Sequence, residues 1–248
     1  MEIAPGVHRI GPTKNGQLKG SYSQCYLFDD GKSLTLVDAG YDNDGHTIIE
    51  YLWKLGRTPD ELDHIALTHA HRSHLGGVAA LKALNPKLKI YAHKFEAPII
   101  AGRRGAQPVS LFPPLPLKLV PLRILTHLGI PKHRPCTVDV LLDDDDDGRM
   151  IGPLEVLFTP GHTPGCLSFY WRERGALALG DIVATWPTFD AGWPGFNLDE
   201  ALYQQSLGRL VALAPKVVCP GHGLAVTENT AERLESLLKG PYWPASKP

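Results

Sequence analysis

The chain has 248 residues, 43% of them hydrophobic and 21% charged, with a formal net charge of −1. These values are typical of a globular protein that buries a sizeable core, and they exclude a disordered chain. The sequence contains no stripe of Lys and Arg that could neutralise a run of phosphates, so we expect no nucleic-acid partner.

The N-terminal residues 1–6 lack the basic head and apolar middle of a signal peptide, and no apolar run reaches membrane-spanning length. The four cysteines lie far apart and form no CxxC pair, which favours buried thiols in a reduced compartment. We therefore expect a cytoplasmic protein without membrane contacts. At this length a single domain over residues 1–248 is the favoured organisation.

The first elements predict a sheet of antiparallel hairpins. Short strands are expected at 6–10, 22–28 and 33–37, separated by turns that contain glycine. A helix should follow, with Asp44 able to cap its start and Gly56 ending it.

A βαβ unit is expected next, with strands at 63–67 and 89–92 around a helix at 75–84. The loop after its first strand, Thr68-His69-Ala70-His71-Arg72-Ser73-His74, carries three histidines. Histidines two residues apart cannot share a helix face, because same-face neighbours are three or four apart. His69 and His71 should therefore lie on a turning loop that can wrap both imidazoles around one metal ion.

Residues 94–136 break this pattern, since prolines leave room only for short helices. The segment is too apolar for a solvated linker, so we interpret it as an insertion that packs over something. The sequence allows two interpretations of this insertion: a lid over the site, or a loop that merely covers the edge of the core. The following run Asp143 to Asp147 is interpreted as a solvated turn, because calcium loops space their oxygen ligands apart.

The second half repeats the strand pattern. Three of its predicted strands end in loops that carry a candidate ligand: 154–159 before His162, 176–179 before Asp181, and 216–219 before His222. A further strand is expected at 166–171 and a closing helix at 227–239. Asn197 and Glu200 have the spacing of a capping box, which predicts a helix from there to about residue 213.

Five pieces of the chain resemble the metallo-β-lactamase-fold hydrolase superfamily in the order in which that family carries them. They are Leu36-Val37-Asp38-Ala39-Gly40, Thr68 to Gly77, Thr159 to Gly165, Gly180-Asp181 and Pro220-Gly221-His222-Gly223. The resemblance implies an α/β (α+β) fold, a four-layer αββα sandwich of two mixed β-sheets flanked by helices. It also implies a first metal on His69, His71 and His162, a second on His74 and His222, and Asp181 bridging both.

Asp38 belongs to the same resemblance, but we interpret it as a structural hydrogen-bonding residue. Ser73 departs from the family pattern, which has an aspartate ligand of the second metal at that position. A hydroxyl is a much weaker ligand than a carboxylate, so Ser73 should act weakly or in the outer sphere. We expect one tight site and a weaker second site, with Zn²⁺ favoured and iron or manganese as the alternatives.

Zinc held by three histidines lowers the pKa of its bound water to about 7 and polarises a carbonyl. The sequence therefore predicts a metal-dependent hydrolase that attacks a small-molecule carbonyl, in an ester, thioester, lactone or β-lactam, with a metal-bound hydroxide. The alternative is a degenerate metal-binding or sensing protein with little turnover, which Ser73 favours. Four rings near the loop after Asp181 suggest a pocket for an apolar part of the substrate, although core or homodimer contacts would also explain them: Trp186, Phe189, Trp193 and Phe196.

Overall fold

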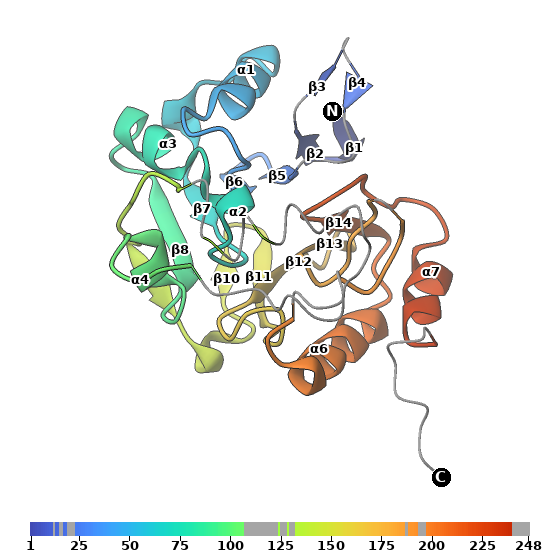
Figure 1. The fold of residues 1–248 in the computed structure, drawn as a ribbon. Coiled ribbons are helices and arrows are strands. Elements are labelled where there is room, and N and C mark those ends of the chain that lie inside the picture. The colour runs from blue at the N-terminus through green and yellow to red at the C-terminus, as the bar shows by residue number, and fades with distance from the viewer. Residues whose placement is uncertain are drawn as a thin grey trace.

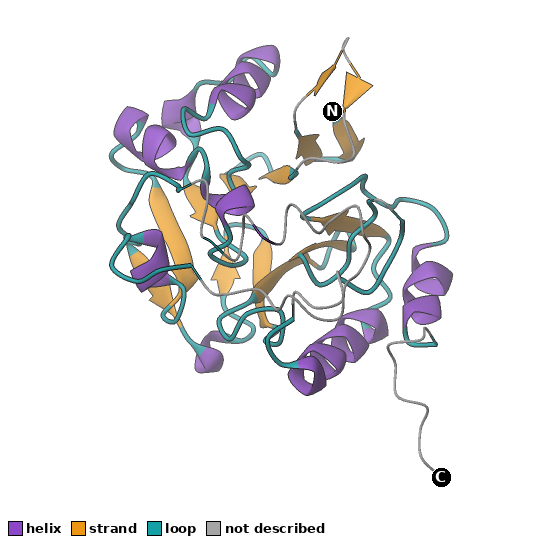
Figure 2. Cartoon of the chain, in the orientation of Figure 1, coloured by secondary structure: helices purple, strands orange, loops and turns teal. Residues whose placement is uncertain are grey.

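The computed structural model describes residues 1–11, 13–14, 17–18, 23–106, 124, 128, 132–186, 188–192 and 197–239. Two β-sheets pack face to face, and helices cover both outer faces (Figure 1, Figure 2). This is the αββα sandwich of mixed sheets that the sequence predicts. The predicted residues Trp193 and Phe196 lie outside the described part of the chain.

The first sheet contains seven strands in the order β1-β2-β5-β6-β7-β8-β9. Its neighbours are antiparallel from β1 to β6 and parallel from β6 to β9. The change occurs where hairpins give way to crossover connections, because parallel neighbours cannot be joined by a tight turn. The strands are β1 (Glu2–Ala4), β2 (Val7–Ile10), β5 (Cys25–Asp29), β6 (Leu34–Val37), β7 (His64–Ala66), β8 (Lys89–His93) and β9 (Val140–Leu142), with β3 (Thr13–Lys14) and β4 (Gln17–Leu18) as a separate pair.

The second sheet has five strands in the order β10-β11-β12-β13-β14. They are antiparallel except for β13 and β14, which run parallel and are connected through helix α6. The strands are β10 (Met150–Ile151), β11 (Leu154–Phe158), β12 (Leu167–Trp171), β13 (Ala176–Gly180) and β14 (Val217–Pro220).

The helices divide between the two sheets (Figure 1). Those on the first half of the chain pack over the first sheet, where Leu52 of α1 and Leu81 of α3 join the buried cluster of that face. Those on the second half pack over the second sheet, where Leu207 and Leu234 join another cluster. The helices are α1 (His46–Lys54), α2 (Arg72–Leu75), α3 (Val78–Leu84), α4 (Ala97–Ile100), α6 (Glu200–Ala212) and α7 (Thr230–Leu237), with single 3₁₀ turns η1 (Pro59–Glu61) and η3 (Asp144–Asp146).

Several helix boundaries differ from the predictions. The helix expected at 75–84 is two helices, α2 and α3, separated by Gly76 and Gly77, whose backbone N–H groups bond to Gly40 and Ala39 rather than within a helix. The N-cap of α6 is Asp199, which accepts a hydrogen bond from Leu202, and not Asn197. Asn197 is therefore not the cap, and its side-chain oxygen contacts His162 instead.

The predicted insertion begins with α4, and the described parts at its two ends pack on the first sheet's helix-side cluster through Ile99, Ile100 and Cys136. The acidic run forms the turn η3, in which Asp146 pairs with Arg149 and Asp147 pairs with Arg209. These contacts agree with the interpretation of a surface turn. Among the described residues, no helix has both the length and the apolar character needed to cross a bilayer.

Candidate metal centre

Six buried side chains meet where four strands end. His69, His71 and His74 follow β7, and the other three follow β11, β13 and β14 respectively: His162, Asp181 and His222. Their ligand atoms form two groups, His69/His71/His162/Asp181 and His74/Asp181/His222, and within each group all atoms lie within 4.8 Å of one another. The structure thus brings together the six residues that the family resemblance implies as ligands.

The first group draws three imidazoles from two loops. His71 Nδ1 lies 3.1 Å from His162 Nε2, although the residues are far apart in the sequence. The Nε2 atoms of His69 and His162 each lie 3.8 Å from Asp181 Oδ2. Among the described residues, the buried Nε2 of His69 has no hydrogen-bond partner.

The second group shares Asp181 with the first. Its two carboxylate oxygens lie 3.3 Å from His74 Nε2 and 3.5 Å from His222 Nε2. Gly221 allows this approach, because a Cβ there would meet Asp181 Oδ1 at 2.5 Å and His74 Cε1 at 2.6 Å. The glycine before His222 is therefore needed for packing at the centre itself.

Burial and neighbouring charges prepare most of these groups to bind a cation. Burial, together with the adjacent imidazoles, holds the pKa values of His69 and His71 well below the usual range. Burial likewise lowers the pKa of His162, and it lowers that of His222 to about 4. Burial raises the pKa of Asp181, but nearby His222 and His74 outweigh it and hold that pKa well below its usual range. Neutral imidazoles and an ionised carboxylate are the forms that ligate metals.

His74 differs from the other four histidines. Burial alone would lower its pKa, but the carboxylates of Asp181 and Asp38 raise it to about 10. The two carboxylates thus favour the protonated form of His74, and a metal at this position has to compete with that proton.

Asp38 connects two of the candidate ligands. Its Oδ2 accepts a hydrogen bond from His74 Nδ1 at 2.8 Å, and both of its oxygens accept from the Thr68 hydroxyl. Thr68 Oγ1 in turn lies 3.0 Å from His69 Nδ1. Because the Thr68 hydroxyl donates its proton in a hydrogen bond to Asp38, its oxygen can accept a hydrogen bond from His69 Nδ1–H. Both Nε2 atoms are then directed toward the centre, which is the orienting role that such outer partners play.

Asn197 contacts a third candidate ligand. Its Oδ1 lies 3.3 Å from His162 Nδ1, and its amide nitrogen donates to Glu200. The spacing of Asn197 and Glu200 predicts a helix cap instead, and the sequence predictions do not include Thr68 in the centre. Thr68 precedes the first ligand directly, but nothing in the spacing shows which ligand Asn197 reaches.

The remaining predicted site residues lie around this core. Ser73 is half-buried on α2, between His71 and His74. Trp186 is half-buried in the loop after Asp181. Phe189 packs against the outer cluster of the second sheet, and the guanidinium of Arg233 lies 4.5 Å from its ring centroid.

The donor set fits a metal. Imidazole nitrogens with one shared carboxylate are the ligands that zinc and iron use in proteins. A buried imidazole nitrogen without a hydrogen-bond partner, as at His69 Nε2, is costly unless a ligand satisfies it.

Comparisons with known proteins agree with this geometry. The profile of the Metallo-beta-lactamase superfamily matches residues 18–222. The chain is 31% identical to the "Probable metallo-hydrolase YqgX" of Bacillus subtilis, over 93% of this chain and 95% of that protein. It is 30% identical to YobT of the same organism, over 87% of this chain and 88% of that protein. An atrochrysone carboxyl ACP thioesterase of Aspergillus fumigatus is 24% identical over 94% of this chain, which spans 60% of that protein.

Two solved structures share the fold. The metallo-beta-lactamase FIM-1 from Pseudomonas aeruginosa, in a mono-zinc form, has a TM-score of 0.65 at 20% identity, over 98% of this chain and 95% of that one. TTHA1623 in a di-iron-bound form has a TM-score of 0.61 at 26% identity, over 91% of this chain and 97% of that one.

Proposed function

Since the chain belongs to the metallo-beta-lactamase superfamily, we propose that it is a metal-dependent hydrolase of a small-molecule carbonyl substrate, in an ester, thioester, lactone or β-lactam. The observation that carries the proposal is the single carboxylate of Asp181 shared by two groups of buried histidines. Zinc is the favoured metal, because imidazole-rich sites with one carboxylate suit it.

His69, His71 and His162 would hold a first ion, His74 and His222 a second, and Asp181 would contact both. When bound, zinc supplies a Lewis acid for the substrate carbonyl and lowers the pKa of a water ligand to about 7. Burial of all six side chains excludes bulk solvent from behind the centre and strengthens its electrostatics. Asp38, through Thr68 and directly, keeps the protons of His69 and His74 on Nδ1, so that both Nε2 atoms remain available.

Apolar residues that neighbour the candidate ligands in the sequence support a substrate with an apolar portion. Leu198 follows Asn197 directly and is 43% exposed, and Leu224 lies two residues after His222 and is 48% exposed. Trp186 lies in the loop after Asp181. Apolar side chains around a few polar groups are typical of small-molecule sites. The thioesterase relative makes an acyl thioester the first substrate to test.

The experiment is elemental analysis of the purified protein, combined with hydrolysis of a panel of thioesters, esters, lactones and a chromogenic β-lactam. Activity should fall on chelation and return with Zn²⁺. His71→Ala should be inactive under every condition. His46→Ala is the matched control, because His46 is exposed on α1 and lies outside both ligand groups. Absence of a tightly bound metal, or full activity of His71→Ala, would contradict the proposal.

The second candidate is a metal-binding or sensing protein with little turnover, and Ser73 is the observation that favours it. Tight metal binding without hydrolysis of any member of the panel would select it. All four cysteines are free thiols, which supports the cytoplasmic location that we propose for either function.

A further inference from the structure

Glu96 is a buried acid outside both groups of candidate ligands. It is 1% exposed and lies directly before α4, where the predicted insertion begins. A buried carboxyl group is costly unless several donors satisfy it. The donors that satisfy Glu96 therefore show which segments it holds together.

Those donors belong to the two loops that supply the first group of ligands. The backbone N–H of Ala70, between His69 and His71, donates to Glu96 Oε2 at 3.1 Å. The backbone N–H of Gly165, three residues after His162, donates to Glu96 Oε1 at 3.1 Å. One side chain thus joins two loops that are separated by about ninety residues of chain.

The environment of Glu96 fixes its position. Burial raises the pKa of Glu96, and hydrogen bonds from the backbone N–H groups of Ala70 and Gly165 partly offset that rise. A Cβ on residue 165 would meet Glu96 Cγ at 2.9 Å and His93 Nδ1 at 2.7 Å, so only glycine allows the His162 loop to come this close.

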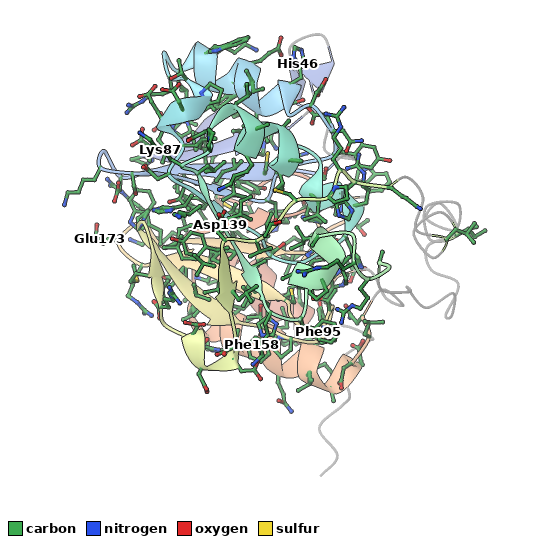
Figure 3. All side chains as sticks on the ribbon, turned by 90° about the vertical axis from the view of Figure 1, so that its left-hand side faces the viewer. His46, Lys87, Phe95, Asp139, Phe158 and Glu173 are labelled. Carbon is green, nitrogen blue, oxygen red and sulfur yellow. The ribbon has the colours of Figure 1, made fainter. Side chains whose placement is uncertain are left out.

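His93 secures the turn that carries Glu96. Its Nδ1 accepts from the N–H of Phe95, so its Nε2–H donates to Asp144. Its ring stacks on Phe158 at a centroid distance of 5.2 Å. Phe95 and Phe158 mark this part of the molecule in Figure 3.

We propose that Glu96 is the positioning residue that sets the separation of the His69/His71 loop from the His162 loop, and hence the affinity of the first group for its metal. The inference rests on the proposed function, because it assumes that this group holds an ion. A second link is the backbone hydrogen bond to Thr68, before His69, from Leu167, which begins β12 directly after the His162 loop, so the two segments stay connected when Glu96 is changed.

The test is Glu96→Gln, which keeps the shape of the side chain but points an amide NH₂ at one of the two backbone N–H groups. Zn²⁺ is titrated into metal-free protein against a chromogenic chelator, and Co²⁺ absorption reports the geometry of the first site. The dissociation constant of the tight step should rise by about 10- to 100-fold, the usual effect of losing a partner that orients metal ligands. The weaker step should change little, and the Co²⁺ spectrum should change.

Glu61→Gln is the matched control, because Glu61 also accepts a backbone N–H, that of Thr58 at 2.8 Å, but contacts neither ligand loop. If Glu96 only supports the fold, Glu96→Gln will lower the free energy of unfolding of the metal-free protein and leave the tight dissociation constant unchanged. That result overturns the inference.

If Glu96→Gln does not fold, Gly165→Ala tests the same inference, since it leaves Glu96 in place and forces the His162 loop away from it. A raised dissociation constant of the tight step supports the inference, and an unchanged one overturns it. A wild-type protein that binds no Zn²⁺ tightly would instead refute the proposed function. Two tight ions in both wild type and Glu96→Gln would refute only the role of Glu96.

Discussion

The two groups of candidate ligands form two halves of the centre, His69/His71/His162 and His74/His222, with Asp181 shared. Both halves use imidazoles, but in different electrostatic surroundings. In the first, His69, His71 and His162 lie close to one another, and burial lowers all three pKa values. In the second, burial lowers the pKa of His222 to about 4 as well, but His74 lies between Asp38 and Asp181, which raise its pKa to about 10. The first half therefore favours neutral imidazoles that can bind a cation, whereas in the second half two carboxylates favour a proton on His74.

This difference predicts unequal affinities. A metal entering the first half meets neutral nitrogens that no proton occupies, but in the second half it must first displace the proton of His74. The resemblance to the superfamily implies a carboxylate where this chain has the neutral hydroxyl of Ser73, next to His74 in the sequence, and this would add to the difference. The shared Asp181 couples the two halves, so their affinities should not be independent.

The largest expected effect separates the two halves directly. His71→Ala should abolish the tight binding step and lower kcat/KM by at least about 1000-fold, because it removes one of the three histidines proposed to hold the first ion. His222→Ala should leave the tight step in place and lower kcat/KM by only about 10-fold, because the first site keeps all its ligands. Chelator competition measures the affinity of the tight step, and steady-state kinetics on the best substrate measure kcat/KM. Equal losses in the two variants would show that the halves act as one unit.

Asp38→Asn should affect both halves at once. The change weakens the contact that holds His74 directly and the contact that holds His69 through Thr68. We expect each dissociation constant to rise by about 10- to 100-fold, as is usual for outer partners of metal ligands. Asp42→Asn is the control, since Asp42 lies farther along the same loop and accepts a hydrogen bond from the backbone N–H of Thr47 instead. An effect confined to one binding step would show that Asp38 orients only one of the histidines.

The sequence was sufficient to predict the six residues that meet at the centre, because each follows a strand and lies in a loop with glycine or proline. It was also sufficient to predict the βαβ unit, whose strands β7 and β8 run parallel. The positions of Asn197 and Glu96 were not predictable in the same way, since their partners are 35 and 26 residues or more away and depend on how the loops fold. Asn197 was assigned to a cap because local spacing fits a capping box, but the tertiary contact to His162 determines its place.

Ser73→Asp should reduce the difference between the halves. A carboxylate at this position would give the second group a charged ligand, so we expect its affinity to rise by about 10-fold and turnover to increase a few-fold. Elemental analysis should move from about one tightly held ion toward two. Ser73→Asn is the control, because it has a similar shape without the charge. Two tightly held ions in the wild type would show instead that Asp181, His74 and His222 are sufficient.

The smallest expected effect lies at the edge of the first half. Asn197 contacts His162 at 3.3 Å, longer than the 2.8 Å between Asp38 and His74, and its side chain is half-buried rather than enclosed. A long hydrogen bond near solvent contributes little to orientation, so Asn197→Ala should raise the tight dissociation constant by only about 2- to 5-fold and leave the weaker step unchanged. Asn197→Asp should restore the affinity, because its carboxylate can accept from the same His162 Nδ1–H. A loss of affinity as large as that in Asp38→Asn would mean that the first half depends equally on each residue that orients its histidines. The number of neutral imidazoles would then not explain why the first half binds metal more tightly.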